Sequence, residues 1–188
     1  IYQSQCALYL LLSSEDSDVN VCIEKFDDIS FHKEEDPYLQ LQVKYHSSDG
    51  EITNTSTDFW RTIKAWIDNI QVNPNLLQNT SFYIITTNII AKDSIIEKIQ
   101  KRTDCKSKSS STYKRYDTFL NMSADIIKKL IQSMKIQPAF PDPISINQKI
   151  FNKLQLFTSK QTIQIVYDRL LGWWYRKIVE CLSSINPV

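Results

Sequence analysis

From Leu39 to His46, apolar and polar residues alternate without exception. Successive side chains of a β-strand point to opposite faces, so this segment predicts a strand with an apolar face at positions 39, 41, 43 and 45 and a polar face at 40, 42, 44 and 46. The preceding segment VNVCIEKF (19–26) is also rich in β-formers. DDISF (27–31) is either a second strand or the same strand after a bend, and the charged segment HKEEDP (32–37) predicts a turn.

Helical patterns flank these strands. Residues 2–13 predict a short apolar helix, and apolar residues at helical spacing in FWRTIKAWIDNI (59–70) predict an amphipathic helix that begins at Thr57 or Asp58. The continuous apolar run of SFYIITTNII (81–90) is typical of a strand buried on both faces.

The second half of the chain is mainly helical by periodicity. We expect helices within 93–102 and 117–136, a proline-rich break at 138–143, and helical structure from 144 to 183. The order helix, strand, strand, strand, helix, strand, helix predicts the α/β class, with a small central mixed sheet flanked by helices and a helical C-terminal extension.

Charge is unevenly distributed along the 188 residues, although the net charge is only +1. Residues 1–60 carry twelve acidic residues against three lysines, a net charge of −9, and the rest of the chain carries +10. This distribution excludes a uniformly basic nucleic-acid binder and permits an acidic pocket beside a basic surface. A basic cluster interleaved with tyrosines would either contact a DNA backbone or form an ordinary solvated loop; it consists of Lys101, Arg102, Lys106, Lys108, Lys114 and Arg115.

Cysteine use and hydropathy bear on the compartment. The four cysteines lie far apart and include no CxxC pair, so we predict a cytoplasmic protein with free thiols and no zinc site. The apolar stretch CALYLLL (6–12) is too short to cross a bilayer and lacks the flanks of a signal peptide, so no membrane partner is expected. The absence of an initiator methionine suggests a fragment of a longer chain.

The candidate chemistry lies on the polar positions of the predicted strands. Gln42 and Lys44 are two residues apart and can therefore reach one point in space. Asp28 or Asp27, at the start of DDISF, supplies an anionic ligand for Mg²⁺ or Mn²⁺, and Glu24 could add a second carboxylate. Gln42 offers an amide oxygen to the same cation, and Lys44 offers positive charge to an attacking water or a phosphate. We therefore predict Asp28, Gln42 and Lys44 as catalytic residues and Asp28, Gln42 and Glu24 as metal ligands.

The arrangement EKFDDISF, turn, LQVKYH, together with the helix TDFWRTIKAW, resembles the PD-(D/E)xK nuclease superfamily in its Gln-x-Lys variant. The likeness is greatest to the double-stranded DNA endonuclease domains of CD-NTase-associated and ABC-three-component anti-phage effectors. It covers roughly residues 1–100, with weaker support from RLLGWWYRKIVECL (169–182). The resemblance implies a restriction-endonuclease-like sandwich in residues 1–137. Residues 138–188 would be a helical extension that packs on it or links it to a following domain.

In terms of this family, Asp28 is the metal aspartate, and Gln42 and Lys44 form the Gln-x-Lys pair. Gln5 stands where many members carry an acidic residue on the first helix, and Asp27 and His46 are additional candidates. The resemblance implies Mg²⁺-dependent hydrolysis of phosphodiester bonds in double-stranded DNA, within a bacterial anti-phage defence protein. It also implies a homodimer or an activator-induced oligomer, and a regulatory domain C-terminal to this segment.

The alternative function is a catalytically inactive domain of the same fold that binds DNA or holds subunits together. It stays open because glutamine replaces a carboxylate in the triplet, and fewer carboxylates weaken the affinity for a metal ion.

Overall fold

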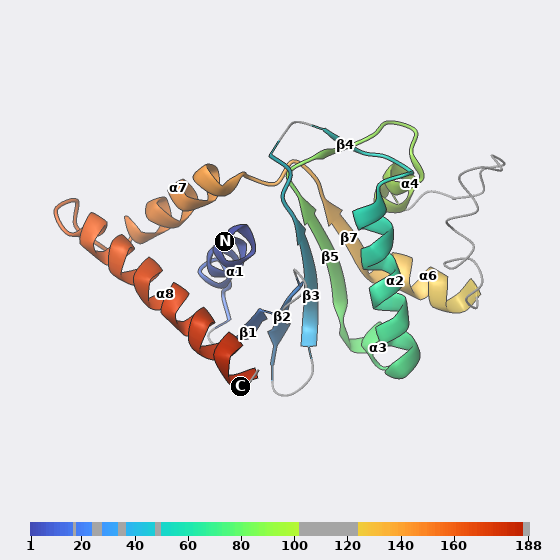
Figure 1. The fold of residues 1–188 in the computed structure, drawn as a ribbon, viewed down its shortest axis with the longest axis horizontal. Coiled ribbons are helices and arrows are strands. Elements are labelled where there is room, and N and C mark those ends of the chain that lie inside the picture. Colours follow the sequence, from blue (N-terminus) through green and yellow to red (C-terminus); the bar gives the residue numbers. More distant parts are fainter. Residues whose placement is uncertain (17, 24–27, 34–36, 48–49, 102–123, 186–188) are drawn as a thin grey trace.

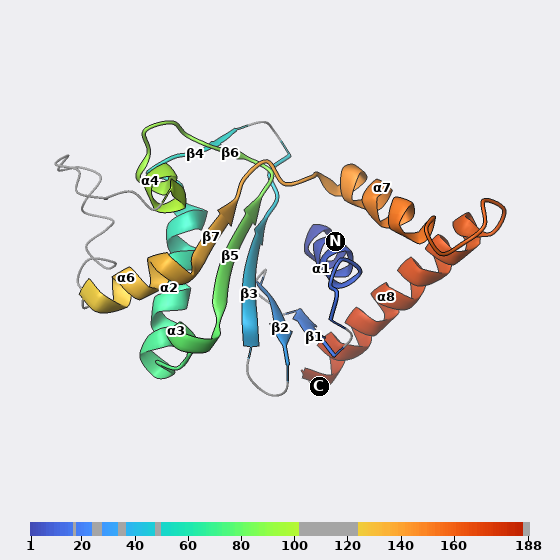
Figure 2. The same cartoon turned by 180° about the vertical axis from the view of Figure 1, so that it is seen from behind.

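The computed structural model contains a five-stranded sheet with helices on both faces (Figure 1). The structure describes residues 1–16, 18–23, 28–33, 37–47, 50–101 and 124–185, and at positions 28, 124–128 and 184–185 it describes the backbone alone. Seen from either side, α1, α7 and α8 lie on one side of the sheet and α2, α3, α4 and α6 on the other (Figures 1 and 2). This arrangement confirms the α/β class predicted from the order of elements.

The sheet is mixed, with strand order β1-β2-β3-β5-β7. Its first three strands pair antiparallel, whereas β5 and β7 each pair parallel to the strand before them in this order. A second sheet consists of β4 and β6 alone, also paired parallel. The strands are β1 (Asn20–Ile23), β2 (Asp28–His32), β3 (Pro37–Lys44), β4 (Glu51–Ile52), β5 (Ser81–Thr86), β6 (Ile89–Ile90) and β7 (Met134–Gln137).

One face of the sheet packs on α1 (Tyr2–Leu11), which is in turn covered by α7 (Pro143–Leu154) and α8 (Ile163–Ile185). Leu41 and Val43 of β3 are buried in this layer, as the alternation of the strand predicts. The indole Nε1 of Trp174 on α8 donates a hydrogen bond to the backbone oxygen of Ser4, 2.8 Å away, and so joins the two ends of the chain.

The other face packs on α2 (Thr57–Val72), with α4 (Ile95–Lys101), α6 (Ala124–Ser133) and the short α3 (Leu76–Asn79) around it. The amphipathic pattern of α2 is confirmed, because its apolar residues are buried against the sheet. These buried residues of α2 are Phe59, Ile63, Trp66, Ile67 and Ile70.

Four boundaries differ from the prediction. The N-cap of α2 is Ser56 rather than Thr57 or Asp58. The segment 81–90 divides into β5 and β6, because the chain turns after Thr86 and pairs with β4 instead. The predicted helix at 117–136 gives way at Met134 to β7, whose alternate residues are buried. Finally, the helical region 144–183 is interrupted between α7 and α8.

Candidate functional site

The backbone brings two of the predicted catalytic positions together. In the antiparallel pair of β2 and β3, Asp28 is the Cα partner of Gln42, and directly opposed positions in such a pair occupy the same side of the sheet. Lys44 follows two residues later as the last residue of β3. Glu24 and Asp27, predicted as a metal ligand and an additional candidate, lie outside the described residues, as does the side chain of Asp28.

Gln42 is buried between β3 and α2. Its side chain is only 4% exposed, and its Oε1 accepts a hydrogen bond from Oγ1 of Thr62 at 3.1 Å. Thr62 belongs to α2 and is 2% exposed. Because Leu41 and Val43 pack on the opposite layer, the polar face of β3 is directed toward α2. The predicted alternation therefore holds at the site itself.

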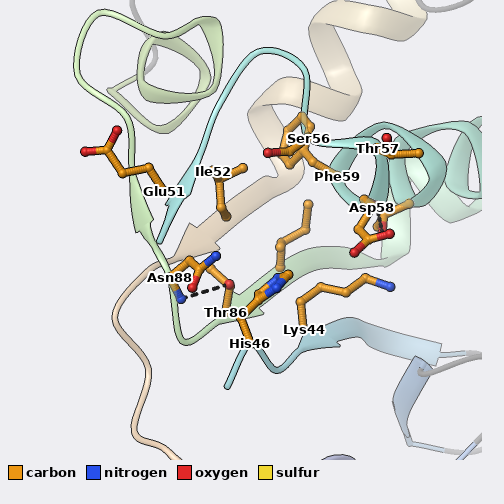
Figure 3. Close-up of a pocket in the computed structure, with 12 residues that line it drawn as sticks. Lys44, His46, Glu51, Ile52, Ser56, Thr57, Asp58, Phe59, Thr86 and Asn88 are labelled. Carbon is orange, nitrogen blue, oxygen red and sulfur yellow. Dashed lines mark hydrogen bonds between the residues drawn. The ribbon is translucent and has the colours of Figure 1, made fainter. Parts of the chain in front are cut away.

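Lys44 lies at a pocket of about 290 Å³ between the end of β3, the first turn of α2 and the segment around β4. In Figure 3, Asp58 on α2 extends its carboxylate toward the Lys44 side chain, and the His46 ring lies beside them. A second, more polar pocket of about 410 Å³ shares Lys44, His46 and Asp58 and adds Arg61 and Tyr2. The site thus carries cationic and anionic groups side by side, open to solvent.

The chain just beyond β3 is held in place by Thr87. The Thr87 hydroxyl accepts a hydrogen bond from the backbone N–H of His46 at 3.0 Å and lies 3.2 Å from the His46 carbonyl oxygen, to which it donates. The backbone N–H of Thr87 donates to the carbonyl oxygen of Lys44 at 3.3 Å. These bonds fix the direction in which Lys44 and His46 leave the sheet.

Two oxygen-bearing side chains, Gln42 of β3 and Asp58 at the pocket, are of the kind that a hard cation takes, although Gln42 lines neither pocket. Mg²⁺ takes oxygen ligands, and the amide oxygen of Gln42 and the carboxylate of Asp58 are such ligands. Within the described ranges, no three His, Cys, Asp or Glu side chains gather closely enough to hold a metal ion.

Gln5 lies on α1 and contacts α7. It is buried on α1, where its Nε2 donates to Oδ1 of Asn147 on α7 at 3.0 Å. Its Oε1 has no hydrogen-bond partner among the described residues. The described hydrogen bond of the Gln5 side chain is therefore with α7.

Only one member of the predicted DNA-binding cluster is described. Lys101, at the end of α4, donates to Oε1 of Glu97 at 2.6 Å on an exposed face of the helix. This hydrogen bond, with a further one from the backbone of Asp93, lowers the pKa of the Glu97 carboxyl below its usual value. The other five residues lie outside the described ranges: Arg102, Lys106, Lys108, Lys114 and Arg115.

Sequence reasoning missed Asp58 and Thr62 as members of the site. The sequence pattern indicates Asp58 only as a start of the helix and does not single out Thr62. The two are four residues apart on α2 and therefore lie on one helix face. The four-residue spacing of these two polar residues, on the helix that buries Phe59, was the signal in the sequence that could have identified them.

Comparisons with known proteins extend this description. No family model matches the chain, and no curated protein matches it. The fold is similar to a solved Cap4 SAVED/CARF-domain containing receptor from Moraxella osloensis, at 16% sequence identity and a TM-score of 0.56. It is also similar to the Acinetobacter baumannii Cap4 receptor with the cyclic trinucleotide 3′3′3′-cAAA, at 15% identity and a TM-score of 0.55. At these identities the likeness concerns the fold alone.

Both alignments cover 93% of this chain and 42% of the receptor, so the chain spans about two fifths of the length of these structures. Among the helices of the described residues, none has the length and apolar character needed to cross a bilayer.

Proposed function

We propose that this chain is a metal-dependent double-stranded DNA endonuclease domain of a bacterial anti-phage effector. The observation that carries the proposal is the register of β2 and β3, which sets Asp28 opposite Gln42 with Lys44 two residues further along β3. The order of α1, three antiparallel strands, α2 and a parallel β5 supports the restriction-endonuclease-like fold that the sequence resembles.

In this proposal Asp28, Gln42 and Glu24 hold a Mg²⁺ or Mn²⁺ ion. Such an ion neutralises charge on a phosphodiester and makes a bound water more acidic. Lys44 lines the pocket at the start of α2 as a compact positive charge, where it would orient the attacking water or stabilise charge on the scissile phosphate. His46 and Arg61, which line the second pocket together with Lys44, would contact neighbouring phosphates.

The similarity in fold to the Cap4 receptors supports the part of the proposal that places this chain in an anti-phage effector. One of these receptors is solved with a cyclic trinucleotide, and an effector of this kind would be controlled by a second messenger bound elsewhere in the protein. Since this chain spans about two fifths of such a receptor, a regulatory region and an activator-induced oligomer belong to the proposal as well.

A second candidate function is cyclic-nucleotide sensing by this chain itself. It is favoured by the receptor solved with 3′3′3′-cAAA, whose alignment covers 93% of the chain. In that case Lys44 and Arg61 would pair with the phosphates of the cyclic trinucleotide. If neither cleavage nor cyclic-nucleotide binding is found, the remaining alternative is a catalytically inactive domain that binds DNA or holds subunits together.

The test is the nicking of a supercoiled plasmid in the presence of Mg²⁺. We expect cleavage by the wild type, inhibition by EDTA, and a loss of about 100-fold or more in Lys44→Ala, the usual scale for removing a group that stabilises charge in the transition state. Lys64→Ala is the matched control, because Lys64 is an exposed lysine that pairs with Asp68 on the surface of α2. Unchanged cleavage by Lys44→Ala would overturn the assignment, whereas binding of 3′3′3′-cAAA by calorimetry without cleavage would favour the second function.

A further inference from the structure

Tyr45 is an aromatic residue that stays half exposed at the end of the apolar face of β3. The alternation of the strand groups it with Leu41 and Val43, which are buried, yet Tyr45 is 47% exposed. Its ring packs on that of Tyr2 from α1, with the centroids 5.0 Å apart and the planes tilted by 43°. Tyr2 is buried, and its Oη donates a hydrogen bond to the carbonyl oxygen of Pro141 at 2.7 Å. Tyr45 therefore presents a supported aromatic surface to solvent.

This aromatic surface belongs to the wall of the second pocket, the one of about 410 Å³. Charged side chains line the same pocket: Lys44 and His46 flank Tyr45 in the chain, and Arg61 lies on α2. Among the described residues, no carboxylate lies within ion-pair distance of Lys44 or Arg61. Asp58 also lines the pocket, so its described side chains carry two cations against one carboxylate when His46 is neutral. The pocket thus combines an excess of positive charge with an aromatic surface.

The aromatic and the charged groups approach the pocket from different sides of β3. Tyr45 contacts α1 through Tyr2, whereas Lys44 and His46 share the first pocket with residues of α2. A ligand in the second pocket would therefore span the end of the strand, with an anionic part toward α2 and a flat part toward α1. A nucleotide has both parts, because its phosphate pairs with lysine and arginine and its base stacks on aromatic side chains. The volume of the pocket lies in the range of about 300–1,000 Å³ that is usual for small-molecule sites.

We propose that the second pocket binds a nucleotide whose base is unpaired, with the base stacked on Tyr45 and the phosphate held by Lys44 and Arg61. This inference rests on the proposed function for the identity of the strand, which is DNA, and it names the form of DNA that the site takes. Inside a duplex the faces of each base are covered by its neighbours, so a base must leave the stack before it reaches a pocket. A strand with unpaired nucleotides therefore binds more tightly than an uninterrupted duplex.

The experiment measures the binding of a fluorescently labelled, single-stranded oligothymidylate by anisotropy, in EDTA so that metal-dependent cleavage does not occur. Tyr45→Leu keeps an apolar side chain against Tyr2 but removes the aromatic face. We expect its affinity for the single strand to fall about 5- to 150-fold, the usual loss when one base loses its aromatic partner. Tyr45→Phe keeps the ring and should bind within about threefold of the wild type on the same scale. Trp173→Leu is the matched control, because Trp173 is 46% exposed and lies on α8; it should bind like the wild type.

A blunt duplex of the same length separates stacking from charge. The ratio of single-strand to duplex affinity should fall in Tyr45→Leu, because only the unpaired base uses the aromatic face. In Arg61→Gln both affinities should fall and their dependence on salt should become weaker, as expected for the loss of a phosphate contact. Single-strand binding by Tyr45→Leu that equals the wild type would overturn the inference. An equal loss in Tyr45→Phe would also overturn it, since the hydroxyl rather than the ring would then be responsible. Melting temperatures of all variants verify that each one is folded.

Failure of the proposed function has a different result. If the wild type binds the single strand through Tyr45 but does not nick plasmid in Mg²⁺, the endonuclease proposal fails and the nucleotide pocket stands as part of a DNA-binding domain. If the wild type nicks plasmid but Tyr45→Leu binds the single strand equally well, the nucleotide pocket alone fails. Binding of 3′3′3′-cAAA by the wild type but not by Tyr45→Leu, without binding of the single strand, would overturn DNA as the source of the nucleotide.

Discussion

Asp58 and Lys44 line the same pockets from two different elements, Asp58 from the first turn of α2 and Lys44 from the last residue of β3 (Figure 3). The carboxylate thus stands at the N-terminal end of a helix, where negative charge is stabilised, and faces a group of opposite charge. Asp58 thus gives the pocket a carboxylate in addition to those expected at positions 24, 27 and 28.

The first prediction concerns that carboxylate. In Asp58→Asn the pocket loses one anionic oxygen donor, and we expect the Mg²⁺ concentration for half-maximal plasmid nicking to rise about tenfold, as when a group beside a metal site is removed. Asp68→Asn, on the exposed face of the same helix, should leave it unchanged. An unaltered Mg²⁺ requirement in Asp58→Asn would show that this carboxylate plays no part in the metal chemistry.

The second prediction concerns the contact between α8 and α1. Trp174→Phe removes the buried hydrogen bond from the indole to the carbonyl oxygen of Ser4 and part of the packed ring. We expect a loss of about 1–3 kcal/mol in the free energy of unfolding, measured by urea denaturation. Trp173→Phe is the matched control, because Trp173 is 46% exposed whereas Trp174 is 7% exposed; it should change stability by less than about 0.5 kcal/mol. Equal effects of the two substitutions would contradict this account.

The period of two in β3 was enough to predict which of its residues share a face, but not which helix covers that face. Leu41 and Val43 are buried on the α1 side and Gln42 contacts α2, because alternation is a local property of the strand. The strand β7 was missed for a related reason. Its four residues directly follow the last turn of α6, and so short an alternation cannot be distinguished from the end of an amphipathic helix.

The composition of the site depends on contacts that the local pattern does not contain. Thr62 reaches Gln42 across 20 residues of sequence, and Gln5 reaches Asn147 across 142. Neither pair can be predicted from propensity or periodicity, because each depends on how the helices dock on the sheet. Gln5 illustrates the consequence, since its place on the first helix was predictable but its contact with α7 was not.

The third prediction concerns the reactivity of Cys6. This thiol is fully buried, and burial raises its pKa to about 12. Because the thiolate is the reactive form, Cys6 should react with a disulfide reagent at pH 8 only after unfolding. Cys181 is exposed and should react within the mixing time of the assay. The measurement uses two variants, in each of which only one of these two cysteines is retained and the others are serine. Rapid labelling of Cys6 in the folded protein would contradict the buried position.

The same raised pKa has a consequence for stability in alkaline solution. An unfolded cysteine ionises near pH 8.5, whereas folded Cys6 keeps its proton up to about pH 12. The unfolded state therefore releases a proton that the folded state retains, and stability falls as the pH rises through this interval. Burial also raises the pKa of the neighbouring Tyr2, so its contribution has the same sign.

The fourth prediction concerns the start of α7, where Asp142 is the N-cap. Its Oδ1 accepts hydrogen bonds from the backbone N–H groups of Ile144 and Ser145 at 2.8 and 2.9 Å. These bonds, that of Ser145 most strongly, lower the pKa of the Asp142 carboxyl below its ordinary value. A carboxyl whose pKa is lowered in the folded state stabilises the protein at pH values above the pKa of the unfolded carboxyl, about 3.9. This contribution is lost as the pH falls through the lower pKa of the folded state.

Two substitutions at position 142 separate the charge of the cap from its hydrogen bonds. Asp142→Ala removes both and should lower the melting temperature at pH 7. Asp142→Asn keeps a side-chain oxygen that can accept from the same N–H groups, so it should melt closer to the wild type at pH 7. As the pH falls from about 3.9, where the unfolded carboxyl becomes protonated, through the lowered pKa of folded Asp142, the melting temperatures of wild type and Asp142→Asn should converge. A constant difference between them from pH 7 to pH 2 would show that the ionised carboxylate of Asp142 is not what stabilises the start of α7.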